Sequence, residues 1–270
     1  LADEKNSVST AVRAQYETNP YPRWVRMQSS FAAAPLAQIV RELFPHFEAK
    51  ALPEKPRILV AGCGTGQNAI ATAQRFAGAS VLAIDLSLAS LGYAKRKTLE
   101  LGLTSIEYRQ ADILSLAGLE ERFDLIECSG VLHHLEDPFE GWRILAGLRK
   151  PGGLMRVGFY SEAGRRPVAR ARALIAAEGF TPDPAGIRAC RAAIRARAGD
   201  ELLDRIARNE DFFSMSGCRD LMFHVHEHRF TLPQVESMIA RLGLRFLGFE
   251  FPDSGATRQR YRVRFPGDSD

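Results

Sequence analysis

The glycine-rich turn after the first apolar run is the feature that most constrains the fold. Gly62, Gly64 and Gly66 stand at alternate positions directly after the apolar residues 58–60. Glycine has no Cβ and adopts positive φ freely, so a strand that turns through this sequence into a helix can bring its backbone close to a ligand. The sequence therefore predicts a strand, turn and helix with a ligand-binding loop.

Short β-prone runs alternate with helical patterns through the following hundred or so residues. The runs lie at residues 58–61, 81–84, 106–109, 123–128 and 154–159. Helix starts are marked by Ser87 and by Asp137 before Pro138, both good N-terminal caps. Strands that alternate with helices predict a parallel sheet covered on both faces.

The C-terminal part predicts one more helix and a hairpin. Residues 231–244 have the pattern of a capped amphipathic helix, and residues 245–251 and 258–265 have the pattern of strands. The linker between these two runs is too short for a helical crossover, which favours an antiparallel pair. The predicted fold class is α/β, a mostly parallel seven-stranded sheet with helices on both faces and a terminal antiparallel hairpin.

Residues 161–230 do not fit this alternation. They are rich in alanine and arginine and have helical patterns interrupted by the turn sequence at residues 179–186. An insertion after the fifth strand would cover the carboxyl ends of the strands, where open α/β sheets bind ligands. We therefore expect a helical insertion that caps a ligand site.

Composition sets the remaining limits. The 270 residues are 46% hydrophobic and 25% charged, with no apolar run long enough for a membrane helix and no secretory leader. The four cysteines are far apart, so neither a disulfide framework nor a zinc site is expected. A net charge of +4 indicates neither nucleic-acid nor membrane binding. A cytoplasmic protein is expected, and the start at Leu1 favours either a piece of a longer polypeptide or a processed product.

An acidic residue after the second strand narrows the ligand. Asp85 stands nineteen residues after Gly66, where a carboxylate can accept both hydroxyls of a ribose. The glycines have the spacing GxGxG. The dinucleotide pattern GxGxxG would have its third glycine at position 67, which is Gln67 here. The combination predicts an adenosine compound and makes a nicotinamide oxidoreductase the weaker alternative.

The loop resembles motif I of the class I S-adenosylmethionine-dependent methyltransferases, which have a Rossmann-like fold. The segments VLAIDLS, YRQADI, FDLIECSGVLHHLEDP and LRKPGGLM are similar to later motifs of that family. Val60 departs from the pattern, because the family often has there an acid that helps to position the methionine portion of the cofactor. The resemblance implies S-adenosylmethionine as cofactor and S-adenosylhomocysteine as product. The implied cofactor-binding residues are Gly62, Cys63, Gly64, Gly66, Asp85, Leu86, Asp112, Ile113 and Ser129.

A narrower resemblance concerns the N-terminal sequence YETNPYPRW and residues 212–234. Both are similar to methyltransferase domains attached to bacterial tetratricopeptide-repeat proteins. This implies such repeats as partners in a full-length chain. With the fold, it divides the chain into an N-terminal helical segment and lid at residues 1–50, a cofactor-binding core at 51–160, a helical insertion or acceptor-site cap at 161–230, and the last helix and strands at 231–270.

Methyl transfer needs alignment in a dry pocket, and a base only if the nucleophile arrives protonated. The candidate bases are His134, His224 and His228, whereas His226 is expected to point away. His133 and His134 have packing as the alternative role. Three alternating histidines could also bind a metal, but without cysteine or carboxylate partners of recognised spacing no metal site is predicted.

The candidate substrate or lid residues are polar or aromatic groups of the N-terminal segment and of the stretch that returns from the predicted cap to the core. They are Tyr16, Tyr21, Arg23, Trp24, Asp220 and Glu227. Packing on the sheet edge is an equal alternative for the N-terminal four. The predicted function is methyl transfer to an unidentified small molecule. The alternatives are a protein lysine methyltransferase module, which needs an open groove, and a cofactor-binding regulatory module without turnover.

Overall fold

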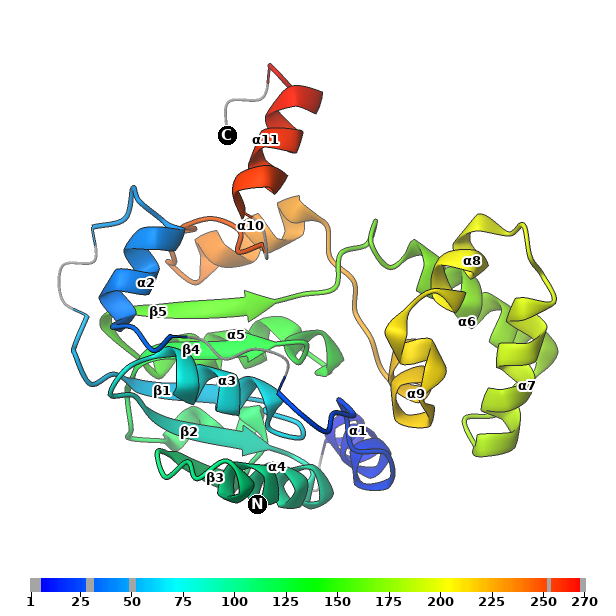
Figure 1. The fold of residues 1–270 in the computed structure, drawn as a ribbon, viewed down its shortest axis with the longest axis horizontal. Coiled ribbons are helices and arrows are strands. Elements are labelled where there is room, and N and C mark those ends of the chain that lie inside the picture. The colour runs from blue at the N-terminus through cyan, green and yellow to red at the C-terminus, as the bar shows by residue number, and fades with distance from the viewer. Residues whose placement is uncertain (1–5, 28–31, 49–51, 252–253, 268–270) are drawn as a thin grey trace.

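The core is a five-stranded parallel sheet. The computed structural model describes residues 6–27, 32–48, 52–251 and 254–267. The strands are β1 (Arg57–Ala61), β2 (Ser80–Asp85), β3 (Ile106–Gln110), β4 (Phe123–Ser129) and β5 (Arg149–Gly158). Their order is β3-β2-β1-β4-β5 (Figure 1). The order reverses between β1 and β4, and at such a point the loops after the strands diverge and leave a crevice at the carboxyl ends.

Helices cover both faces of the sheet, as the alternation predicts. One face packs with α5 (Pro138–Gly147), α10 (Leu232–Arg241) and the short η1 (Ile113–Gly118) in a core that includes Leu82, Ile126 and Leu145. The other face packs with α2 (Leu36–Leu43), α3 (Gln67–Arg75) and α4 (Leu88–Glu100) around residues such as Val81 and Leu91. Because both faces are covered, the central strands are almost continuously buried.

The helix starts follow the predicted caps. Ser87 accepts a hydrogen bond from the Ser90 amide at 3.0 Å at the start of α4. Asp137 accepts hydrogen bonds from the first amides of α5, and Pro138 occupies its first position. These local signals were sufficient because a cap depends only on residues within one turn.

A separate helical unit follows β5. It consists of α6 (Arg166–Glu178), α7 (Pro184–Arg195), α8 (Glu201–Ala207), η3 (Glu210–Phe213) and α9 (Met215–Phe223), and it has its own apolar core. Figure 1 shows this unit beyond the carboxyl ends of the strands, with α9 facing the N-terminal helix α1 (Ser7–Thr18). The chain returns toward the sheet through residues 224–230, where Ser161 and Phe230 form a parallel bridge.

The predicted seven strands and terminal hairpin are wrong. Residues 245–251 have no regular secondary structure, and residues Ser254–Arg264 form helix α11 instead of a strand. The alternation of arginine with apolar residues over 258–265 suits a strand only if one face is buried, whereas Tyr261, Val263 and Phe265 are exposed. Arginine is also a good helix former, so the segment has no packing that would favour a strand. Residues 252–253 of the expected linker lie outside the described residues.

The described ranges lack two kinds of feature, a membrane-spanning helix and a cluster of metal ligands. None of the helices there is both long and apolar enough to cross a membrane. The same ranges contain no cluster of three or more histidine, cysteine or acidic residues suited to a metal ion. Of the expected lid at residues 1–50, residues 1–5, 28–31 and 49–50 lie outside the described part.

Candidate functional site

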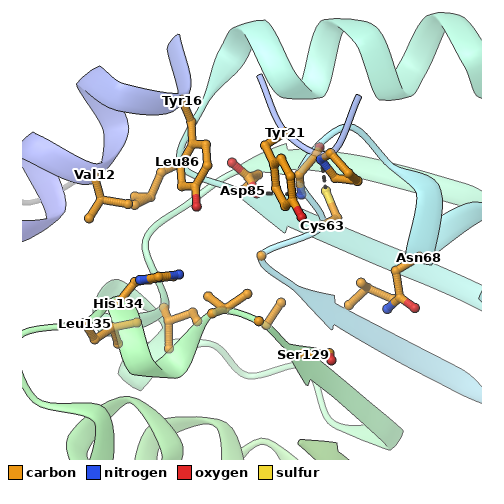
Figure 2. A pocket seen from close by; sticks show the side chains of 18 of the residues that line it. Val12, Tyr16, Tyr21, Cys63, Asn68, Asp85, Leu86, Ser129, His134 and Leu135 are labelled. Carbon is orange, nitrogen blue, oxygen red and sulfur yellow. Dashed lines mark hydrogen bonds between the residues drawn. The ribbon is translucent and has the colours of Figure 1, made fainter. Parts of the chain in front are cut away.

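A cavity of about 440 Å³ opens at the carboxyl ends of the strands, where the strand order reverses. Figure 2 shows Tyr16, Tyr21, Asp85 and Cys63 on one side of it and His134 and Leu135 on the other. Its volume is within the range of small-molecule and cofactor sites. Twelve of the predicted site residues line it: Gly62, Cys63, Gly64, Asp85, Leu86, Asp112, Ile113, Ser129, His134, Tyr16, Tyr21 and Asp220.

The glycine loop is shaped by protein contacts as well as by the cavity. A Cβ on Gly64 would stand 2.5 Å from the Tyr21 carbonyl oxygen, and one on Gly66 would stand 2.6 Å from the Ala94 Cβ in α4. Both glycines have positive φ, of +52° and +86°. Gly66, one of the residues expected to bind the cofactor, does not line the cavity. Its physical role is to let the start of α3 approach α4.

Asp85 joins the glycine loop to the start of the next helix. Its Oδ2 accepts a hydrogen bond from the Gly64 amide at 2.7 Å, and its Oδ1 accepts one from the Ser87 amide at 2.9 Å. Burial raises the pKa of this carboxyl, and the two backbone hydrogen bonds oppose the shift. Each oxygen has a second lone pair, so the carboxylate can hold the loop and still accept hydroxyl groups from the cavity.

The adjoining wall comes from the segment after β3. Asp112 is buried, and its Oδ1 accepts a hydrogen bond from the Leu114 amide at 2.9 Å, which caps η1. Ile113 and Leu86 add apolar surface beside it. Cys63 is buried, and burial raises the pKa of its thiol. The thiol is therefore neutral and contributes packing rather than a nucleophile.

The N-terminal strap, residues 19–24, packs on the glycine loop. The Tyr21 carbonyl accepts a hydrogen bond from the Thr65 amide at 3.2 Å, and the Pro22 carbonyl accepts one from the Thr65 hydroxyl at 2.6 Å. Trp24 is buried, and its indole N–H donates to Thr65 Oγ1 at 3.0 Å. Trp24 therefore supports the loop from behind, and Arg23 is exposed. Neither of these two predicted lid residues lines the cavity.

Tyr16, Asp220 and His224 form a hydrogen-bonded chain at the other end of the cavity. The His226 amide donates to His224 Nδ1 at 3.1 Å, so the neutral imidazole has its proton on Nε2, which lies 3.1 Å from the Tyr16 hydroxyl. The Tyr16 hydroxyl then donates to Asp220 Oδ1 at 2.7 Å. Burial lowers the pKa of His224 to about 2, which keeps it neutral. Both of its nitrogens are engaged with Tyr16 and the His226 amide, and His224 does not line the cavity.

Asp220 is the acidic group of this end. Its side chain is buried, and burial raises its pKa to about 7. No described residue donates to its second oxygen. A carboxyl with a pKa near neutrality and a free oxygen at a cavity wall can accept a proton from a bound molecule.

His134 is the histidine that reaches the cavity. Its Nδ1 lies 2.7 Å from the His226 carbonyl oxygen, and its ring stacks on His224 at 3.6 Å. Burial lowers its pKa to about 4, so the ring is neutral with the proton on Nδ1. Nε2 is therefore an acceptor. His133 is fully buried, stacks on Tyr160 at 3.7 Å and does not line the cavity, which agrees with a packing role.

The other predicted acceptor-site residues lie behind the wall. His226 and His228 face each other, with 3.0 Å between their Nε2 atoms, and neither lines the cavity. The expected contrast between an outward His226 and an inward His228 is therefore absent. Glu227 pairs with Arg165, whose guanidinium lies 3.8 Å from the Tyr160 ring centroid. Glu227 thus holds the arginine that lies over the Tyr160 ring in the wall.

The sequence reasoning missed thirteen of the residues that line the cavity. Among them are the charged Arg156 of β5, the amide Asn68 of α3, and Ser9 and Val12 of α1. The signal for Arg156 was a charged residue inside the predicted strand run at residues 154–159, which has no other charge.

Comparison with known proteins agrees with this geometry. Residues 58–153 match the family described as methyltransferase domain. An uncharacterised protein of Synechococcus sp. is 32% identical over 92% of this chain and 61% of its own length. A ubiquinone biosynthesis O-methyltransferase of Stutzerimonas stutzeri is 41% identical over 45% of this chain and 50% of its own length. The chain thus spans about half to three fifths of the curated relatives that it matches.

Solved structures agree on the fold. The structure of PKMT2 from Rickettsia typhi superimposes with a TM-score of 0.65 at 18% identity, over 89% of this chain and 49% of that one. The same protein has also been solved in complex with AdoHcy, with a TM-score of 0.63. The family match covers the glycine loop, Asp85, Asp112 and Ser129, which are the groups that line the cavity, and supports S-adenosylmethionine as the cofactor. Residues 58–153 of this chain therefore match a methyltransferase domain, and the chain shares the fold of these solved structures.

Proposed function

We propose that this chain transfers a methyl group from S-adenosylmethionine to a small-molecule acceptor. One observation carries the proposal: a single cavity joins a nucleoside-type end, with Gly64 and Asp85, to a proton-accepting end, with Asp220 and His134. An enzyme of this kind needs a donor and an acceptor in one dry space, because alignment supplies most of the acceleration. The methyltransferase relatives support the reaction class.

The donor end fits an adenosine. Asp85 has acceptor capacity left for ribose hydroxyls, and Asp112 has one carboxylate oxygen beyond the one that caps η1. Leu86 and Ile113 provide apolar surface for the adenine ring between these carboxylates. When bound, the donor would supply an electrophilic methyl group on a sulfonium.

The acceptor end is bordered by side chains from three separate segments, which favours a small molecule over a protein side chain. Tyr16 from α1, Tyr21 from the strap and Asp220 from α9 all line it, and the Tyr16 to Asp220 hydrogen bond ties α1 to α9. A protein lysine methyltransferase would need an open groove for a peptide. For this reason a small-molecule acceptor is proposed ahead of a protein lysine side chain.

The polar groups at this end favour an acceptor that carries an O–H or N–H. Asp220 would accept the proton that the nucleophile loses, and His134 Nε2 would accept a hydrogen bond from the same group or from a second donor on the acceptor. The Tyr16 hydroxyl donates to Asp220 and so keeps that carboxylate in place.

The test uses two measurements on the full chain. Calorimetry with S-adenosylhomocysteine should show binding, and 100 times its dissociation constant should stabilise the fold by about 2.7 kcal/mol. Methyl-labelled donor incubated with a metabolite fraction and with a protein fraction should label a small molecule. Label only in protein would support the lysine alternative, and binding without transfer to any fraction would support the regulatory module.

We also propose the finer points that the sequence indicated. The chain is cytoplasmic, and tetratricopeptide repeats accompany this domain in the full-length protein, as the resemblance of residues 16–24 and 212–234 implies. Residues 161–230 serve as the acceptor-site cap, a role supported by Asp220 in the cavity wall.

A further inference from the structure

Three residues on neighbouring strands, two of them charged, lie side by side across the sheet. They lie near the end of the cavity that an adenosine would leave empty. Val60 of β1 pairs in register with Glu127 of β4, and Glu127 pairs in register with Arg156 of β5. Residues paired in a parallel sheet project to the same face. The three side chains therefore lie abreast on the face covered by α3, directly under the start of that helix.

The Glu127 carboxylate contacts neighbouring side chains and does not reach the cavity. It is 2% exposed and does not line the cavity. Its Oε2 accepts hydrogen bonds from the Thr72 hydroxyl and from Asn68 Nδ2, the latter at 3.4 Å, and its Oε1 lies 3.6 Å from Arg156 Nη1. Position 60 has a valine where the family often has an acid, and the acid Glu127 stands one strand away. Glu127 contacts Asn68 and Arg156, which both line the cavity.

Arg156 is the positively charged residue among those that line the cavity. Its Nε donates to Glu250 Oε2 at 2.6 Å, and Glu250 also pairs with Arg75 at 3.0 Å. No described residue accepts a hydrogen bond from Arg156 Nη2. Two carboxylates therefore fix the guanidinium from one side and leave one nitrogen available to an anion.

Asn68 stands beside this arginine in the same wall. It lies in the first turn of α3, whose unpaired amides and dipole favour negative charge. Figure 2 shows Asn68 on the opposite side of the cavity from Val12 and Leu86. A ligand that places its nucleoside between Asp85 and Leu86 would extend its other end toward Asn68 and Arg156.

We propose that Arg156 binds the carboxylate of the amino-acid portion of the methyl donor, with Glu127 and Glu250 holding its guanidinium in place. The inference rests on the proposed function, because it assigns a residue to the donor of that reaction. Arginine suits this task because its planar group donates to a carboxylate in a fixed geometry.

The test compares two ligands that differ only at this end. S-adenosylhomocysteine has the amino-acid portion, and 5′-methylthioadenosine has the same nucleoside and thioether without it. Calorimetry should show that Arg156→Gln weakens binding of S-adenosylhomocysteine by about tenfold or more and leaves 5′-methylthioadenosine unchanged, since only the former loses a charged hydrogen bond. Arg156→Lys keeps the charge without the planar group and should lie between the two.

Arg75→Gln is the matched control. It removes the other arginine of Glu250, whereas Arg75 does not line the cavity, so the affinities for both ligands should stay as in wild type. Equal losses for both ligands in Arg156→Gln, or no loss for either, would overturn the inference while the proposed function stands. If wild type binds neither ligand, the proposed function fails and this inference fails with it.

Discussion

Tyr16 and Asp220 share a hydrogen bond of 2.7 Å although they are 204 residues apart in the chain. The bond joins the N-terminal helix to the last helix of the insertion directly over the cavity. Neither segment contributes to the sheet, so two parts of the chain outside the parallel core join His134 of the core to form the acceptor end. The donor end, with Gly64 and Asp85, comes from the core.

Asp220→Asn should change how stability depends on pH. The folded-state pKa of about 7 is above the ordinary value of 3.8, so the folded protein holds this proton more tightly than the unfolded chain. The resulting stabilisation is full below about pH 4 and is lost as the pH rises through about 7. Urea unfolding should therefore show the wild type losing about 2–3 kcal/mol relative to the variant between pH 5 and pH 8, at about 1.4 kcal/mol per pKa unit.

The same variant separates this role from simple packing. Asparagine has nearly the same shape, so S-adenosylhomocysteine binding should be retained while methyl transfer to a protonated nucleophile falls. A stability difference between wild type and Asp220→Asn that is the same at both pH values would show that the carboxyl titrates normally.

Trp24→Phe should weaken the support behind the glycine loop. The variant keeps an aromatic ring but loses the indole hydrogen bond to Thr65, which should cost about 1 kcal/mol of unfolding free energy. Because Thr65 lies between Gly64 and Gly66, S-adenosylhomocysteine should also bind more weakly. Urea unfolding and calorimetry measure the two effects.

The other tryptophan provides a matched control. Trp142 is also buried, but its indole nitrogen has no partner among the described residues, and the residue belongs to α5 and packs in the core. Trp142→Phe should therefore leave ligand affinity at the wild-type value. If Trp24→Phe also left it there, the strap would have no influence on the loop.

Asp85→Ala should reduce both stability and ligand affinity. The carboxylate accepts two backbone hydrogen bonds, from Gly64 and Ser87, so its removal should cost about 1–3 kcal/mol even without ligand. It should also weaken S-adenosylhomocysteine by about tenfold or more, because the ribose hydroxyls lose a charged acceptor. Thermal unfolding with and without ligand measures both losses.

Asp137→Ala tests whether the loss of stability and the loss of ligand affinity are separable. Asp137 likewise accepts two backbone amides, those of Phe139 and Glu140, but it caps α5 away from the cavity. It should lower stability by about 1 kcal/mol without altering affinity. A loss of affinity as large as that of Asp85→Ala would mean that general destabilisation explains both.

The parallel core could be predicted from the sequence because its signals are local. The five strand runs, the glycine turn and the caps at Ser87 and Asp137 each depend on a few neighbouring residues, and all appear in the structure. The predicted hairpin failed because whether an alternating run becomes a strand depends on a partner edge and a buried face, which residues 258–265 do not have.

The acceptor end could be predicted only as a set of residues. Asp220 and His134 reach the cavity as expected, but His224 and His228 have the same residue type and different roles. The direction of each ring is fixed by contacts with α1 and with η2 (Leu132–His134), which are far away in the sequence. Their tautomers likewise depend on backbone groups that the sequence alone does not place.

Gly66→Ala should be among the most damaging single changes in the core. The residue has a φ of +86°, and the new Cβ would lie 2.6 Å from the Ala94 Cβ and 3.0 Å from its Cα, so α3 and α4 would have to move apart. The left-handed conformation costs about 1–2 kcal/mol and the overpacking about 1–3 kcal/mol more. Gly102→Ala isolates the first of these costs, because its φ is +67° with no atom within 4 Å of the added Cβ. Urea unfolding should therefore show a loss of about 1–2 kcal/mol for Gly102→Ala and a clearly larger one for Gly66→Ala, with weaker S-adenosylhomocysteine binding only in the latter. Equal losses in the two variants would show that the contact between the glycine turn and α4 relaxes without cost.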